Sequence, residues 1–188
     1  MQVCNKNYKM NFKEFPQLTT SRLCLRKLEE SDWECVSFLR SDKTVNHFVQ
    51  RPNADTKEKA IQFIENINLK FKSNQILYWC ISLENEQRMI GSICLWNFSE
   101  DRKTAEIGYD LDPDFQNNGI MDESMKVVLS FGFSHLGLKK VEAFTHSKND
   151  NSIKLLRRNK FRLKEGRIDK DNLEIIIFEV DRPAMVQG

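Results

Sequence analysis

The chain of 188 residues carries 29 basic and 27 acidic side chains, which leaves a formal net charge of +2 at pH 7. This balance gives no basis for a dedicated nucleic-acid-binding protein, so we expect no nucleic-acid partner. No apolar run approaches the roughly 18 residues of a membrane span, and the N-terminal residues lack the apolar stretch of a signal peptide, so we expect no membrane partner.

The length fits a single domain with a sizeable core. We expect an irregular arm over residues 1–17, which could pack on the domain or stay loose, one domain over residues 18–181, and a tail over residues 182–188. The five cysteines, Cys4 among them, form no CxxC pair, and with three scattered histidines they fit no zinc pattern. We therefore expect free thiols, no metal site and a reduced, cytoplasmic protein.

The first part of the chain predicts one strand and two helices. Residues 22–28 alternate between apolar and polar side chains, as a strand does. The residues from Ser31 to Glu34 match a capping box, so we expect a helix to start there. A second helix is indicated by apolar residues at 3.6-residue spacing, which are Ala60, Phe63, Ile64, Ile67 and Phe71.

Three strands are expected next, over residues 76–83, 89–98 and 105–111. Short polar turns separate them, so they should form an antiparallel meander. A helix should follow and end at Leu136, with Gly137 in the left-handed cap.

The last part of the chain predicts a strand over residues 139–146, a helix over 149–160, and a final antiparallel pair of strands over 161–165 and 173–180. The whole order predicts an α/β (α+β) fold, in which helices cover a mixed sheet.

The segment from Ala105 to Ser124 combines a strand, a turn and the start of a helix. Its loop, Gln116-Asn117-Asn118-Gly119, lies directly before the helix. Such a loop directs backbone N–H groups at one point, which is a geometry that binds phosphate. By itself the loop is neither a GxGxxG nor a Walker A motif, so an ordinary strand-to-helix connection is the alternative.

Residues 106–119 resemble the acetyl-CoA-binding segment of the GNAT superfamily of N-acetyltransferases. In that family the pattern Gln/Arg-x-x-Gly-x-Gly/Ala holds the pyrophosphate, and the closest resemblance is to the RimJ/RimL-type branch, which includes enzymes that acetylate ribosomal proteins. Further segments that resemble this branch are Arg22-Leu-Cys-Leu-Arg26, Ile90-Gly91-Ser-Ile93-Cys-Leu95, Gly137-Leu-Lys-Lys-Val-Glu-Ala143, Asn149-x-x-Ser152-x-x-Leu155 and Lys160-Phe161-Arg162. The resemblance covers roughly residues 18–180. It implies the GNAT fold, a mostly antiparallel sheet of about seven strands with about four helices.

The resemblance implies an acyltransferase that uses acetyl-CoA as co-substrate and no metal. Glu106 would be the general base, acting through water, and Ser152 would protonate the leaving thiolate. The alternatives are an exposed strand carboxylate without a role and an ordinary helix start. Tyr109 is a weaker candidate for the acid, because it should share a face with Ile107 and Leu111.

The residues expected to bind acetyl-CoA fall into three groups. The strand should pair with the pantetheine arm, the loop and helix start should bind the pyrophosphate through backbone N–H groups, and Asn149 should contact the pantetheine unless it serves only as a helix cap. The strand residues are Tyr109, Asp110 and Leu111. The residues of the loop and helix start are Gln116, Asn117, Asn118, Gly119, Ile120 and Met121.

Three residues depart from the family pattern. Met121 stands where a small residue is usual, the next residue is Asp122, and Asn118 stands where glycine is common. We expect Met121 and Asp122 to weaken acetyl-CoA binding without abolishing it.

The resemblance implies direct attack by a primary amine in a ternary complex. A protein N-terminal α-amine is the first candidate acceptor, and a small amine, such as a polyamine or an antibiotic, is the alternative. A degenerate, non-catalytic CoA-binding module on the same fold is the second class of function. We expect a monomer or a homodimer.

Overall fold

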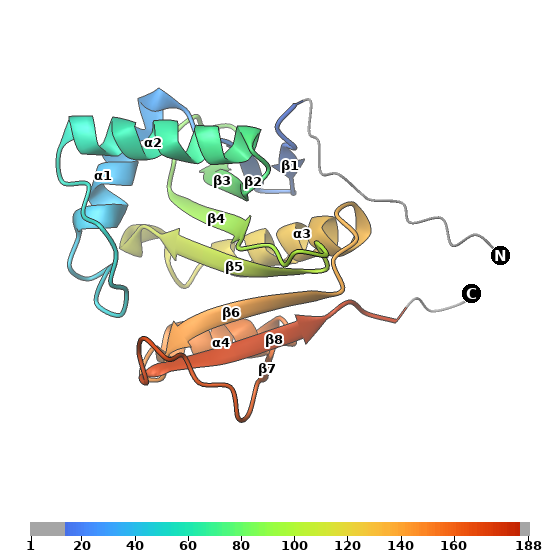
Figure 1. Cartoon of the computed structure of the whole chain (residues 1–188). Helices are drawn as coiled ribbons and strands as arrows, with labels where there is room; N and C mark the ends of the chain where they lie inside the picture. Colours follow the sequence, from blue (N-terminus) through green and yellow to red (C-terminus); the bar gives the residue numbers. More distant parts are fainter. Residues whose placement is uncertain (1–13, 185–188) are drawn as a thin grey trace.

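The computed structural model describes residues 14–184, which form a sheet of eight strands in the order β1-β2-β3-β4-β5-β6-β8-β7, flanked by helices (Figure 1). Cys4 and most of the expected N-terminal arm lie outside the described residues. The strands are β1 (Leu18–Thr19), β2 (Leu23–Lys27), β3 (Ile76–Leu83), β4 (Gly91–Trp96), β5 (Thr104–Leu111), β6 (Lys140–His146), β7 (Arg162–Leu163) and β8 (Ile175–Asp181). The helices are α1 (Trp33–Ser41), α2 (Lys57–Lys72), α3 (Ile120–Ser134) and α4 (Asp150–Arg158), with 3-10 turns at Glu30–Asp32 and Pro113–Phe115.

The fold class is as predicted, with two differences in detail. The sheet has eight strands rather than about seven, because Leu18–Thr19 pairs with β2. The expected capping box from Ser31 to Glu34 is wrong: the box joins Glu29 and Asp32 and precedes a 3-10 turn, and α1 begins at Trp33. The meander of β3, β4 and β5 and the final antiparallel pair are confirmed.

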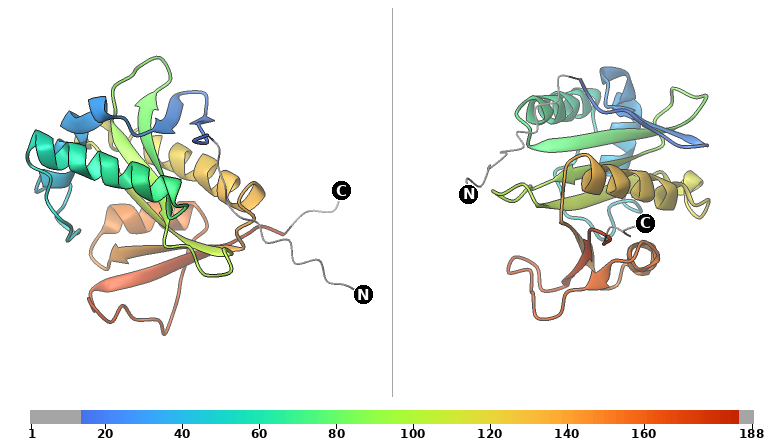
Figure 2. Two further views of the ribbon diagram at one scale, coloured as in Figure 1. Left: turned by 45° about the horizontal axis from the view of Figure 1, so that its top comes forward. Right: turned by 90° about the vertical axis from the view of Figure 1, so that its right-hand side faces the viewer.

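The two faces of the sheet are covered by different helices. Helices α3 and α4 pack on one face, around buried residues such as Ile107 and Met125. Helices α1 and α2 pack on the other face, where Ile64 and Tyr78 belong to a second buried cluster. Figure 2 shows the sheet between these two layers.

Strands β5 and β6 run parallel and then separate. Their register contains three pairs, the last of which joins Glu106 to Glu142, although each strand continues for several residues. Figure 1 shows the two ribbons close together at one end and apart at the other. From Ile107 to Leu111, the edge of β5 that faces β6 therefore has no sheet partner within residues 14–184. Backbone groups along this edge are free to bind another extended chain.

Strand β5 also lies unusually close to Gly91 on β4. A Cβ atom at Gly91 would lie 2.7 Å from the Asp110 carbonyl oxygen and 2.7 Å from the Leu111 Cδ1 atom. We expect Gly91→Ala to lower the free energy of unfolding by about 1–3 kcal/mol, because the backbone of β5 must move. Urea denaturation measures the loss.

Gly132→Ala is the matched control in α3. Its Cβ atom would meet the ends of two leucine side chains, at 3.2 and 3.5 Å. Alanine is also favoured over glycine inside a helix by about 1 kcal/mol, so this variant should remain close to the wild type. Equal losses in the two variants would contradict the close approach at Gly91.

Candidate active site

A cavity of about 290 Å³ lies at the end of β5, between the N-terminus of α3 and one side of α4. Strand β5 contributes Tyr109 and Leu111. The remaining lining comes from the loop and the two helices and consists of Gln116, Asn117, Gly119, Ile120, Met121, Asp122, Asn151, Lys154, Leu155 and Arg158. The structure thus brings together the strand, the loop and the helix start that the sequence singled out. Three of the expected residues, Asp110, Asn118 and Asn149, are not among those that line the cavity.

The loop before α3 adopts the conformation of an anion-binding site. Asn117 and Gly119 both have positive φ angles, of 62° and 74°, and Gly119 is the N-cap of the helix. The first N–H groups of a helix have no intrahelical acceptor and lie at the positive end of its dipole. They therefore form a ready site for phosphate oxygens at the mouth of the cavity.

Two side chains hold this loop in place. The Gln116 Nε2 atom donates a hydrogen bond to the Leu111 carbonyl at 3.2 Å, which joins the loop to the end of β5. The Arg22 guanidinium donates to the Asn118 carbonyl at 3.2 Å and to the Glu123 carboxylate at 2.8 Å. The helix start is therefore anchored to β5 on one side and to the first strands on the other.

Tyr109 reaches from β5 to α4 on the face of the sheet that α3 and α4 cover. Its hydroxyl lies 2.8 Å from the Ser152 Oγ atom on α4, and either group can be the donor. Burial raises the pKa of Tyr109 to about 12, so the phenol carries its proton at neutral pH. The Tyr109 ring packs against the core, as expected, and its hydroxyl reaches Ser152. The choice of Ser152 over Tyr109 as the acid stays a prediction.

Asn149 caps α4 through its side chain. The Asn149 Oδ1 atom accepts a hydrogen bond from the Ser152 backbone N–H at 3.1 Å. The helix-cap alternative is therefore confirmed as a structural role. The cavity is lined one turn further along, by Asn151 and Lys154.

Glu106 lies on the opposite face of β5 from Tyr109. The Asn97 Nδ2 atom donates a hydrogen bond to the Glu106 Oε1 atom at 2.6 Å. Burial raises the pKa of Glu106; the hydrogen bond from Asn97 opposes this shift, and the charge of Glu142 adds to it. Glu142 itself is ion-paired with Arg167 and Lys164. Glu106 is therefore a carboxylate with a raised pKa at the point where the two strands separate.

The Asp122 carboxylate forms an ion pair with Lys126 and accepts a hydrogen bond from Asn159. Its carboxylate oxygens lie 2.7 Å from the Lys126 ammonium and 2.9 Å from the Asn159 amide nitrogen. Burial opposes ionisation, but these two contacts outweigh it and lower the pKa of Asp122. Met121 is 8% exposed and packs in the core next to the cavity.

Three further observations concern residues 14–184. No cluster of three or more His, Cys, Asp or Glu side chains in this range could hold a metal ion. No helix in it is both long enough and apolar enough to cross a membrane. The cysteines it contains, Cys24, Cys35, Cys80 and Cys94, are free thiols.

An opened sheet beside a helix N-terminus, with ionisable groups on both faces of the separating strand, is an arrangement suited to an enzyme that transfers a group from a phosphate-bearing donor. Residues 22–162 match the family described as acetyltransferase (GNAT) domain. The chain belongs to this family, and it is an N-acetyltransferase of the GNAT type. The family uses acetyl-CoA as donor.

Relatives and solved structures agree with this assignment. The chain is 32% identical over 152 residues to the uncharacterized N-acetyltransferase YoaA of Bacillus subtilis, covering 81% of this chain and 85% of that protein. A GNAT-family acetyltransferase from Bacillus anthracis superposes with a TM-score of 0.76 at 22% identity, over 89% of this chain and 99% of that one. RimL, an alpha-N-protein acetyltransferase of a ribosomal protein, in complex with coenzyme A, has a TM-score of 0.68 at 19% identity, over 86% and 95% of the two chains. At these identities the two structures show the shared fold.

Sequence reasoning missed two residues of the site, Lys154 and Asn97. Lys154 and Arg158 are four residues apart, so they lie on one face of α4 and both line the cavity; that spacing could have indicated Lys154. Asn97 gave no such signal, because its contact with Glu106 joins two strands across a hairpin.

Asn149→Ala should destabilise the protein by about 0.5–2 kcal/mol, because it removes the cap of α4. Ser152→Ala keeps that cap, since the bond from Asn149 is made to the Ser152 backbone. We therefore expect a lower melting temperature for the first variant and a smaller change for the second. Thermal unfolding of both variants measures the two changes in melting temperature. Equal decreases would mean that the hydrogen bond between Tyr109 and Ser152 contributes as much to stability as the helix cap.

Asp122→Asn should strengthen acetyl-CoA binding modestly, and more at low salt than at high salt. The carboxylate lies in the first turn of α3, where it repels a pyrophosphate, although Lys126 and Asn159 already offset part of its charge. Calorimetric titration with acetyl-CoA at two salt concentrations measures the effect. Lys126→Ala should act in the opposite direction, because it leaves Asp122 without its cation. Unchanged affinity in both variants would show that this carboxylate does not influence the donor.

Proposed function

We propose that this enzyme transfers an acetyl group from acetyl-CoA to the N-terminal α-amine of a protein. The observation that carries the proposal is the separation of β5 from β6 directly after Glu106. It leaves a proton acceptor on one face of β5, a pair of hydroxyl groups on the other, and an anion site at the strand end.

The residues around the cavity fit acetyl-CoA. The N–H groups at the start of α3 would hold the pyrophosphate, and the unpaired edge of β5 from Tyr109 to Leu111 would pair with the amides of the pantetheine. Lys154 and Arg158 place two cations on the α4 wall of the cavity, suited to further phosphate oxygens. Met121 and Asp122 make this site less favourable than a small residue and a neutral one would.

When bound, acetyl-CoA supplies a thioester, whose acetyl carbon forms a bond to the amine nitrogen while the bond to sulfur breaks and a thiolate leaves. Glu106 accepts the proton that the amine loses, through a water molecule. Ser152 donates a proton to the thiolate sulfur, and Tyr109 restores the Ser152 proton through the hydrogen bond that joins the two hydroxyl groups. Solvent then returns a proton to Tyr109 and takes up the proton held by Glu106, which resets both groups for the next turnover. Backbone N–H groups on the unpaired edge of β5 polarise the thioester carbonyl.

The character of Glu106 supports an α-amine as acceptor. A carboxylate is a weak base even when burial raises its pKa. An α-amino group has a pKa of about 7.7–8.0, whereas a lysine amine is near 10.4, so the α-amine needs less help to lose its proton. RimL, whose fold this chain shares, is named as an alpha-N-protein acetyltransferase.

The charges on the acceptor face argue against a polyamine. Asp110 and Glu142 lie on the same face as Glu106, but Asp110 pairs with Arg51 at 2.7 Å and Glu142 pairs with Arg167. A polycation would find most of these carboxylates already neutralised. The hydrogen bond from Asn97 orients the Glu106 carboxylate, which a catalytic base needs and a non-catalytic CoA-binding module does not. This contact favours an enzyme over such a module.

The test is steady-state acetylation of peptides with free N-termini, with spermidine and an N-terminally blocked, lysine-containing peptide as competing acceptors. We expect CoA release with the free peptides above all. Glu106→Gln should lower kcat more than acetyl-CoA affinity, because the base acts in the chemical step.

The pH profile adds a second readout. Protonation inactivates the base, so the wild-type rate should fall as pH decreases through the pKa of Glu106, which lies above its ordinary value of 4.5. The glutamine variant should lose this acidic limb, and its deficit should shrink as pH rises and more amine is neutral. The matched control is Glu84→Gln, on the turn after β3. Faster turnover of spermidine than of every peptide would overturn the choice of a protein N-terminus as acceptor. Binding of acetyl-CoA without turnover of any amine would overturn the enzymatic proposal in favour of a non-catalytic CoA-binding module.

A further inference from the structure

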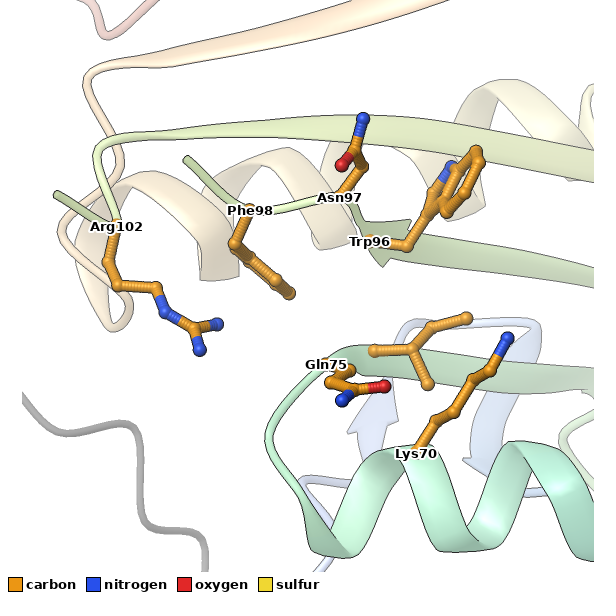
Figure 3. Close-up of a pocket in the computed structure, with 7 residues that line it drawn as sticks. Lys70, Gln75, Trp96, Asn97, Phe98 and Arg102 are labelled. Carbon is orange, nitrogen blue, oxygen red and sulfur yellow. The ribbon is translucent and has the colours of Figure 1, made fainter. Parts of the chain in front are cut away.

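A second cavity, of about 300 Å³, lies between the C-terminal end of α2 and the hairpin that joins β4 to β5 (Figure 3). It does not share a lining residue with the cavity at the end of β5. Its lining consists of Lys70, Gln75, Ile76, Trp96, Asn97, Phe98 and Arg102.

The charged residues that line this cavity are both cationic. The Arg102 guanidinium is fixed by a hydrogen bond of 2.7 Å to the Asn74 carbonyl and lies 5.3 Å from the centre of the Phe98 ring. Lys70 extends from the last turns of α2 toward the hairpin (Figure 3). Among residues 14–184, no carboxylate lines the cavity. The cavity is therefore suited to an anionic group.

The walls combine an exposed aromatic surface with a strained backbone. The Trp96 side chain is 45% exposed although it lies in a strand. Three residues at the rim, Asn74, Asn97 and Arg102, have positive φ angles, of 57°, 46° and 57°. Such backbone strain in non-glycine residues gathers at functional sites.

Two contacts connect this cavity to the acceptor face of β5. Asn97, which lines it, donates the hydrogen bond that holds Glu106. The Trp96 indole nitrogen would lie 3.9 Å from a Cβ atom placed on Gly108, so the ring leans over β5 where no side chain intervenes. A chain whose amine is at Glu106 can therefore continue across Trp96 toward Lys70.

We propose that this cavity binds the residues that follow the acceptor amine, and that it selects acidic N-terminal segments. The amine would lie at Glu106, the backbone of the first residues would cross the Trp96 ring, and one or two carboxylates would meet Lys70 and Arg102. The inference rests on the proposed function, because it takes the acceptor to be a polypeptide N-terminus. It adds a specificity-determining residue, Lys70, and an acceptor class.

The test compares two hexapeptides with free N-termini, identical except for two glutamates or two lysines after the first residue. We expect the wild-type enzyme to acetylate the glutamate peptide with a kcat/KM about fivefold higher, the magnitude of an exposed ion pair, and the preference to shrink at high salt. Lys70→Glu should remove or reverse the preference. Lys72→Glu is the matched control, since this exposed lysine in the same helix end does not line the cavity, and it should keep the wild-type preference.

Binding of the same peptides, measured by fluorescence anisotropy in the presence of CoA, separates this inference from the proposed function. If neither peptide is acetylated but the glutamate peptide binds and requires Lys70, the cavity is assigned correctly and the enzymatic proposal falls. If both peptides are acetylated and bound equally, or if Lys72→Glu changes the preference as much as Lys70→Glu, the acidic subsite is overturned while the acetyltransferase stands. Failure of both peptides to bind or react overturns both.

Discussion

The site depends on one feature of the sheet, the separation of β5 from β6 after the pair formed by Glu106 and Glu142. Had the two strands stayed paired, the backbone groups of β5 would be used within the sheet. Their separation leaves those groups available beyond Glu106. The hydrogen bond between Tyr109 and Ser152 joins the same stretch of β5 to α4. Strand β5 therefore contributes both to the packed core and to the geometry of the site.

Side chains alternate between the two faces of β5, and this alternation places Glu106 and Tyr109 on opposite faces. Glu106 and Tyr109 are three residues apart, an odd number, so their side chains leave the strand on opposite faces. The acceptor face carries a carboxylate that can take a proton, and the face that packs on α3 and α4 carries a buried phenol that holds one. A donor that passes through the gap between the strands would meet both groups.

The elements could be predicted from the sequence because their signals are local: alternation in β2 and β5, helical spacing in α2, and a loop directly before α3. The capping box was misplaced because both Ser31 and Glu29 precede suitable partners, and only tertiary packing selects one. The contacts from Tyr109 to Ser152 and from Asn97 to Glu106 join separate elements, so no local pattern reveals them. The hydrogen bond from Asn159 to Asp122 also joins separate elements and has no local sequence signal.

The carboxylates on the acceptor face have different partners. Asp110 and Glu142 each pair with an arginine. The partner of Glu106 is the neutral amide of Asn97, which orients the carboxylate but adds no full positive charge. Burial and the neighbouring charge of Glu142 then prevail and raise its pKa. Asn97 can orient Glu106 in this way because its left-handed backbone turns the side chain back toward β5, at the rim of the cationic cavity.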